Sequence, residues 1–167
     1  MENLKNEILF LKENIIKVDE SVIENMRQKA NQSESGKFRY CFHENEDAGM
    51  QEMLFVVPKS GYARPHMHKE VAESHVVISG EGTCIVFDDA GNILEHFQVS
   101  HKKNFLYRIQ KGLWHMVMPL SQQMVIYEVR EGKFDKNTNI FPEWASKENE
   151  TEKVKHFKQD IIHKLNL

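Results

Sequence analysis

The stretch Gly61–Gly82 reads GYARPHMHKEVAESHVVISGEG, and its spacing of histidine, glutamate and glycine decides the fold that we expect. His66 and His68 are one residue apart, and Glu73 follows after four more residues. Because alternate residues of a β-strand point to one face, both imidazoles project together if this segment is extended. Two neutral imidazoles and a carboxylate suit a divalent transition metal with open coordination positions. The stretch therefore predicts part of a metal site.

The sequence around this stretch predicts short strands separated by turns. From Gln51 to Arg130, runs rich in Val, Ile and Phe alternate with turn sequences, and hairpin turns are expected at 80–82 and 89–92. There is no helical periodicity between them. About eight such strands predict an antiparallel sandwich or barrel.

Helices are expected on either side of this β-rich region. Residues 1–14 are interpreted as an N-terminal extension, either a tail or a loosely attached helix. Asp19 or Ser21 can cap a first helix that ends near Gly36. Residues 37–50 are interpreted as a polar connection. The expected apolar face of this helix comprises Val22, Ile23, Met26 and Ala30.

The C-terminal segment predicts a second helix that packs outside the strands. Ser146 can cap this helix. We therefore expect the chain to divide into an N-terminal extension over 1–14, a β domain with its N-terminal helix over 15–145, and a C-terminal helix over 146–167. Its apolar stripe indicates contact with the core or with a second copy, and comprises Val154, Phe157, Ile161 and Leu165.

Bulk composition excludes several classes of function. The 167 residues suffice for one domain with its own core, and the net charge is −3. The sequence has no cluster of Lys and Arg, so we do not expect binding to nucleic acid or to an anionic membrane. The N-terminus lacks a basic region and a small-residue cleavage site, so we expect a cytoplasmic protein. Cys41 and Cys84 are the only cysteines, and we expect both to be reduced and buried.

A later histidine can complete the metal site. His115 ends the turn-like sequence Gly112-Leu113-Trp114-His115 and starts a strand. In a closed antiparallel barrel, strands from the two halves face one another. We therefore expect one divalent transition metal (Zn, Fe, Mn or Ni), with one or two positions left for water or substrate. Its predicted ligands are His66, His68, Glu73 and His115.

These two stretches resemble the two motifs of the cupin superfamily. The first is His66-x-His68, four residues, Glu73, six residues, Gly80; the second is 110–115, with Gln110 where proline is usual. The family also commonly has an asparagine four residues after the last histidine, where this chain has Pro119. The resemblance implies an all-β, cupin-like antiparallel β-barrel, also called a double-stranded β-helix or jelly roll. The two helices would pack outside it.

A narrower resemblance extends over about residues 15–147. It is to the WbuC-type cupin metalloproteins, which occur in bacterial gene clusters for O-antigen and other surface polysaccharides. It implies one divalent metal and leaves the reaction open. The similar segments are Arg64-Pro65-His66-x-His68, Phe87-Asp88-Asp89-x-Gly91, Gly112-x-Trp114-His115, Glu128-Val129-x-x-Gly132 and Phe141-x-x-Trp144-Ala145.

Strand alternation predicts further residues of the pocket. Tyr62 and Arg64 share parity with the first two histidines, and Arg64 can hold a carboxylate or phosphate bidentately or form a salt bridge at a strand end. Arg39, with its neighbours, can cover the mouth of the barrel or belong to a polar loop. His75 is a hydrogen-bonded core residue, a hydrogen-bond partner of the metal ligands, or a general base. Glu128 faces either solvent or the pocket, where its pKa would be raised.

Two functions from different classes fit these residues. The first is a metalloenzyme acting on a small sugar-derived or anionic substrate, with His75, Glu128 or Tyr62 moving a proton as in an isomerase or epimerase; an Fe(II) oxygenase is a variant. The alternative is a non-catalytic module that binds or senses a small anion. A buried acid or base near the metal favours the enzyme. A purely structural metal ranks last, and we expect a homodimer.

Overall fold

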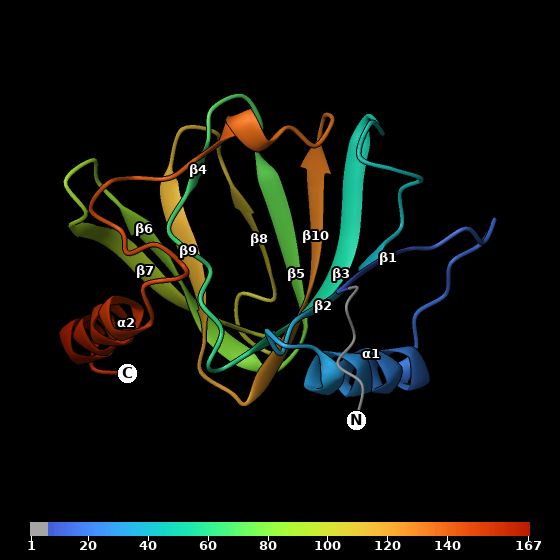
Figure 1. Cartoon of the computed structure of the whole chain (residues 1–167), viewed down its shortest axis with the longest axis horizontal. Helices are drawn as coiled ribbons and strands as arrows, with labels where there is room; N and C mark the ends of the chain where they lie inside the picture. The colour runs from blue at the N-terminus through green and yellow to red at the C-terminus, as the bar shows by residue number, and fades with distance from the viewer. Residues whose placement is uncertain (1–6) are drawn as a thin grey trace.

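The computed structural model describes residues 7–167, which form two facing sheets with a helix outside each (Figure 1). The helices are α1 (Glu20–Gln32), the short 3₁₀ turn η1 (Lys136–Thr138) and α2 (Thr151–Leu165). The strands are β1 (Ile8–Phe10), β2 (Phe38–Cys41), β3 (Met50–Pro58), β4 (Met67–His68), β5 (Glu73–Ser79), β6 (Glu81–Phe87), β7 (Ile93–Ser100), β8 (Leu106–Ile109), β9 (Trp114–Pro119), β10 (Gln123–Glu131) and β11 (Asn139–Ile140).

The larger sheet has six strands in the order β1-β2-β3-β10-β5-β8. Strand β10 lies antiparallel between β3 and β5, so Glu128 is opposite both Met53 and His75. Since side chains alternate along a strand, one face of this sheet turns towards the smaller sheet and the other towards α1. On the α1 face, Met26 and Val56 are fully buried in the same apolar cluster.

The smaller sheet has the order β7-β6-β9 and packs against the inner face of the larger one. Their shared core contains Val77 and Ile126 from the larger sheet and Cys84 and Val99 from the smaller. Cys41 and Cys84 are both buried and free, as expected. A two-stranded sheet of β4 and β11 adds to the end where the histidines lie.

The outer face of the smaller sheet is covered by α2 (Figure 1). The stripe predicted from the sequence is the face that packs, with Ile161 only 3% exposed. Ser146 does not cap this helix, because Glu150 occupies the N-cap position, without a side-chain hydrogen bond. Within residues 7–167, neither helix is long and apolar enough to cross a membrane.

The N-terminal third of the chain differs from the prediction. Residues 8–10 form β1, which pairs in parallel with β2, whereas a tail or helix was expected there; residues 1–6 of that extension lie outside the described part of the chain. Residues 38–41 form β2 rather than a polar connection, because Phe38 and Tyr40 alternate inward and are buried beneath α1. Helix α1 begins after Asp19, which accepts a hydrogen bond from the Val22 amide, and ends at Gln32, before Gly36.

The segment before the first histidine is not the strand that was expected. Residues 61–65 have no regular strand pairing, and Gly61 closes a turn by donating to the Pro58 carbonyl at 2.8 Å. Regular pairing starts only with the bridge at His66 and with β4. Side-chain parity in this segment therefore cannot be carried back from the histidines.

Candidate metal centre

Backbone hydrogen bonds bring the two sequence motifs together. The His66 amide donates to the His115 carbonyl at 3.0 Å, and the His115 amide donates back to His66 at 2.9 Å. The Gly112 amide donates to the His68 carbonyl at 2.8 Å. Glu73 is the first residue of β5. This register places three imidazoles and one carboxylate around a common point, although they are up to 49 residues apart in sequence.

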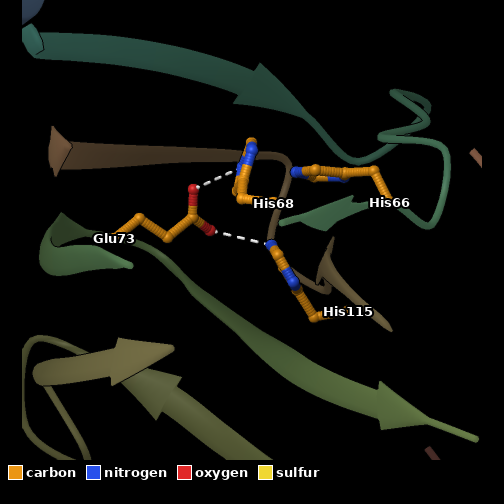
Figure 2. Close-up of side chains that lie close together, drawn as sticks. All are labelled: His66, His68, Glu73 and His115. Atoms are coloured by element: carbon orange, nitrogen blue, oxygen red, sulfur yellow. Dashed lines mark ion pairs between the residues drawn. The ribbon is translucent and has the colours of Figure 1, made fainter. Parts of the chain in front are cut away.

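The four side chains form a group that could hold a metal ion (Figure 2). Glu73 Oε2 lies 3.0 Å from His68 Nε2, and Glu73 Oε1 lies 2.8 Å from His115 Nε2. His68, Glu73 and His115 are each at most 3% exposed. All four ligand atoms lie within 4.8 Å of one another.

The outer hydrogen bonds of two histidines fix which nitrogen faces this point. His66 Nδ1 lies 3.0 Å from the Arg64 carbonyl, and His115 Nδ1 lies 2.9 Å from the Leu113 carbonyl. A carbonyl can only accept, so in both rings Nδ1 carries a proton and donates it. In the neutral ring, Nε2 then carries a free lone pair, and neutral imidazole is the form of histidine that binds metals.

This assignment makes the contact between His115 and Glu73 informative. His115 Nε2 is buried without a hydrogen-bond donor and faces a carboxylate oxygen at 2.8 Å. With a neutral ring, two lone pairs face one another at that distance, and a cation between them removes the repulsion. The residues therefore fit a divalent ion.

Electrostatics favour the ligand forms of these side chains. Burial, with a smaller contribution from the neighbouring His115, lowers the pKa of His66 to about 4, so the ring is neutral at pH 7. Burial alone raises the pKa of Glu73. The positive charge of His75 and the close approach of the His115 and His68 rings outweigh burial and hold that pKa well below its usual value.

A second group extends inward from the same carboxylate. His75 Nε2 lies 3.5 Å from Glu73 Oε1 and 3.4 Å from Glu128 Oε2, while His75 Nδ1 lies 3.0 Å from the Tyr107 hydroxyl. Burial lowers the pKa of His75, but the two carboxylates raise it above its usual value overall. His75 is thus both a buried, hydrogen-bonded residue and a neighbour of the candidate ligands.

Glu128 lies on the cavity side of this group. Its side chain is 17% exposed and lines a cavity of about 280 Å³ together with His66, His68 and Glu73. Burial and the charge of Glu73 raise its pKa, but His75 and Arg39 lower it more, so the net direction is downward. The prediction that Glu128 would have a raised pKa in the pocket is therefore wrong, because the sequence does not show how close His75 and Arg39 lie to this carboxylate.

Three arginines line the same cavity, each over a phenylalanine ring. Arg39, on β2, lies 5.9 Å from the Phe55 ring centroid. Arg64 donates to the Pro142 carbonyl at 2.8 Å and lies 5.1 Å from the Phe141 centroid. The third, Arg130, lies 5.7 Å from the centroid of Phe134. Such contacts hold a planar guanidinium in a fixed orientation, and the N–H groups that make no hydrogen bond within the protein can bind an anion.

The structure places Tyr62 away from this cavity. Its hydroxyl donates to the Ser146 carbonyl at 3.0 Å, and its ring meets Phe157 of α2 edge-on, with centroids 6.1 Å apart. Burial raises the pKa of this hydroxyl. The parity that suggested a pocket position fails because residues 61–65 are not a strand.

Two residues of the site were missed by sequence reasoning. Arg130 is two residues beyond Glu128 on β10, so alternation along the last strand could have identified it. Tyr107 could not be found in this way, because its contact with His75 depends on the β5–β8 register. Near Arg39 in the sequence, the Tyr40 hydroxyl donates to Asn25 and the His43 ring hydrogen-bonds with the Glu52 backbone, so neither covers the mouth.

Comparisons with known proteins agree with this geometry at the level of the fold. The capsular polysaccharide assembling protein CapF from Staphylococcus aureus matches with a TM-score of 0.54 and 23% identity, over 63% of this chain and 31% of CapF. A cupin 2 conserved barrel domain protein from Rhodopseudomonas palustris matches with a TM-score of 0.50 and 16% identity, over 65% of this chain and 68% of that protein. The fold is that of the cupins.

Further matches add no function. The protein SO0799 from Shewanella oneidensis has a TM-score of 0.53 and 11% identity, over 64% of this chain and 74% of its own. A family model described as a domain of unknown function (DUF6016) matches residues 18–99. No curated protein matches the sequence. This cupin-fold chain thus spans 31% of the length of CapF, and its function has to be argued from the site.

Proposed function

We propose that this cupin-fold protein is a metal-dependent enzyme that moves a proton on a small, sugar-derived or anionic substrate, as an isomerase or epimerase does. The observation that carries the proposal is the position of Glu128. This carboxylate lines the cavity of the candidate metal ligands and has a buried imidazole, His75, 3.4 Å behind it. A carboxylate held in this way is suited to take a proton from a substrate carbon and to return it.

Each part of the site has a role in this proposal. A divalent ion held by His66, His68, Glu73 and His115 would polarise a substrate carbonyl, which makes a hydrogen on the neighbouring carbon acidic. Glu128 removes that proton, and the electron pair of the C–H bond delocalises onto the carbonyl oxygen. The proton then returns to the other face of the same carbon, which gives an epimer. In an isomerisation it goes instead to the former carbonyl carbon, while the hydroxyl proton of the adjacent carbon moves to the carbonyl oxygen and a new carbonyl forms there.

Other side chains hold Glu128 and the substrate in place. The Tyr107 hydroxyl at Nδ1 and the carboxylates at Nε2 fix the ring of His75 on the buried side. Arg39 and Arg64 line the cavity, where their guanidinium groups can bind an anionic part of the substrate. Tyr62 has no part in this mechanism, since it packs on α2.

Surface polysaccharide biosynthesis is the setting that we propose. The similar protein CapF is described as assembling capsular polysaccharide, and the WbuC-type resemblance supports the same setting. We also propose that the protein is cytoplasmic and that its two sheets close into a barrel. We propose that it forms a homodimer, which light scattering would test. The bridge between His66 and His115 supports that closure.

A non-catalytic anion-binding module is the alternative. The observation that favours it is the set of three arginines around the cavity, because cations suffice to bind an anion without chemistry. The two candidates differ in what Glu128 does. In the module it has no proton to transfer, whereas in the enzyme its replacement by glutamine stops turnover.

Two measurements test the proposal in turn. Elemental analysis of wild type, His66→Ala and His115→Ala should find about one transition metal ion in the wild type and little in either variant. Equal metal content in all three proteins would sink the metal site. The wild type is then incubated in D₂O with nucleotide-linked keto sugars, and mass spectrometry should detect deuterium next to the carbonyl. Glu128→Gln should keep its metal and lose this exchange; binding without exchange in the wild type would favour the module.

A further inference from the structure

A second cavity adjoins the metal cavity. It has a volume of about 450 Å³, and its walls share Lys37, Arg39, Phe55 and Ala63 with those of the metal cavity. The two cavities are therefore adjacent, and Arg39 lies in the walls of both. Beyond Arg39 the apolar side chains that line the outer cavity and are accessible are Ile8 and Val57.

The junction carries positive charge that forms no ion pair among the described residues, although Arg39 is close enough to Glu128 to lower its pKa. Within residues 7–167, Arg39 has no carboxylate within 4.0 Å, and its guanidinium stacks over Phe55. Lys37 is held beside it by donating to the Tyr62 carbonyl at 3.1 Å. Glu7 lines the outer cavity, but its carboxylate accepts from the amide and hydroxyl of Ser35.

Apart from Glu7, the acids that line the two cavities lie on the metal side. Glu73 and Glu128 belong to the metal cavity and are held by histidines, and Glu148 also lines that cavity. Along the two adjacent cavities the order is therefore the candidate metal ligands, the cations Arg39 and Lys37, and the apolar side chains of Ile8 and Val57. A ligand that matches this order carries its negative charge in the middle.

We infer that the two cavities together bind one elongated phosphate ester. Its phosphate or diphosphate lies at Arg39, its apolar or aromatic group lies in the outer cavity, and its other end reaches the candidate metal ligands. Stacked arginine is suited to phosphate because its fork of donors binds two oxygens at once. The inference rests on the proposed function for the identity of the reacting end. Nucleoside diphosphates and isoprenyl diphosphates both have this chemistry.

Calorimetric titration of the metal-containing, full-length protein separates these sources. The probes are uridine diphosphate, geranyl diphosphate and inorganic pyrophosphate. We expect at least one of the two esters to bind about tenfold or more tightly than pyrophosphate, because only the esters can fill the apolar cavity. Pyrophosphate binding as tightly as both esters would overturn the inference.

Two variants and a control locate the two parts of the ligand. Arg39→Ala should weaken all three probes about tenfold or more. Ile8→Glu should weaken the esters more than pyrophosphate, because its charge opposite Arg39 affects all three probes whereas only the esters also lose an apolar contact. Ile8 is 44% exposed, so its replacement leaves the core intact. Arg108→Ala is the control, because this exposed arginine on β8 only donates to Ser74. The placement would be contradicted if Arg39→Ala left binding of the probes unchanged, or if Ile8→Glu left binding of the esters unchanged.

A metal-stripped sample distinguishes this inference from the proposed function. After chelation, the tighter ester should still bind within about tenfold of its original affinity, because Arg39 and the apolar cavity hold it. Loss of binding on chelation would place the phosphate on the metal and overturn the inference. Absence of deuterium exchange, in contrast, bears on the proposed function alone and leaves the binding result unchanged.

Discussion

At the scale of single residues, Glu73 decides whether the cluster needs a cation. Its two oxygens lie 2.8 and 3.0 Å from Nε2 of His115 and His68. In Glu73→Gln the side-chain amide can donate to an imidazole, so the cluster is satisfied without a metal. Loss of a residue that hydrogen-bonds to a metal ligand lowers metal affinity roughly 10–100-fold. Because Glu73 is itself a candidate ligand, we expect its replacement to lower metal affinity by at least as much.

Competition with a chromophoric chelator measures this affinity. Glu70→Gln is the matched control, because Glu70 is an exposed glutamate in the loop just before β5. Unchanged affinity in Glu73→Gln would mean that the histidines bind the ion alone, as they can in other metal sites with three imidazoles.

His75 gives the metal-free protein a pH-dependent stability. Its carboxylate neighbours raise its pKa above the usual value of 6.5 in the folded state. A group whose pKa rises on folding contributes its full stability below the unfolded pKa and loses it as pH rises through the folded pKa. The Tm advantage of metal-free wild type over His75→Gln should therefore be larger at pH 6 than at pH 9.

Thermal unfolding across this range checks the sign of the effect. His96→Gln serves as the reference, because His96 is exposed on β7. An advantage that stayed constant or grew with rising pH would show that His75 is neutral between Glu73 and Glu128. The range stays above the usual glutamate pKa of 4.5, where protonation of these carboxylates, whose pKa values are lowered, is not involved.

At the scale of elements, the turn between β5 and β6 depends on Gly80. Its φ is +82°, and an added Cβ would clash with the Gln123 carbonyl oxygen. Gly112 has a similar φ of +80° but open space around its Cβ position. Both alanine variants incur the left-handed backbone cost of about 1–2 kcal/mol. Gly80→Ala should lose about 1–3 kcal/mol more, because overpacking is added.

Urea unfolding of the two variants provides the comparison. The difference between them matters more than either value, since the backbone contribution is shared and cancels. Equal loss in Gly80→Ala and Gly112→Ala would mean that the β10 backbone near Gln123 moves to accommodate the methyl group at little cost.

The elements that the sequence predicted well are those with local signals. The hairpin turn at 89–92 and the apolar faces of both helices follow from spacing within a few residues. The hairpin expected at 80–82 is wrong, because the chain turns there but β5 and β6 belong to different sheets. Strand β1 could not be predicted, because three residues in parallel pairing with β2 depend on a long-range contact. The position of Tyr62 was wrong for a related reason, since alternation holds only where a strand is paired.

The same distinction applies to the site. The convergence of His66, His68, Glu73 and His115 was predictable, because two motifs with fixed spacing imply one geometry. The pairing of His75 with Tyr107 and Glu128 was not, because it needs the registers of β5 with β8 and β10. Sequence therefore predicted the residues around the candidate ion and left their neighbours open.

At the scale of the whole molecule, β9 separates the site from α2. His115 and Val117 turn to the inside of the sheets, whereas Met116 and Met118 turn outward to the cluster that contains Ile161. Stability contributed by α2 and the geometry of the candidate metal centre should then be separable. Figure 1 places α2 beside the smaller sheet, on the side away from the larger one.

Ile161→Ala tests this separation. Because Ile161 is 3% exposed in a packed cluster, we expect a loss of about 2–5 kcal/mol in the free energy of unfolding. Metal content per folded molecule should stay at the wild-type value, and Lys155→Ala, at an exposed position of α2, should change neither quantity. If metal content fell in Ile161→Ala while circular dichroism remained native, α2 would set the position of β9, and the outer helix would belong to the functional unit.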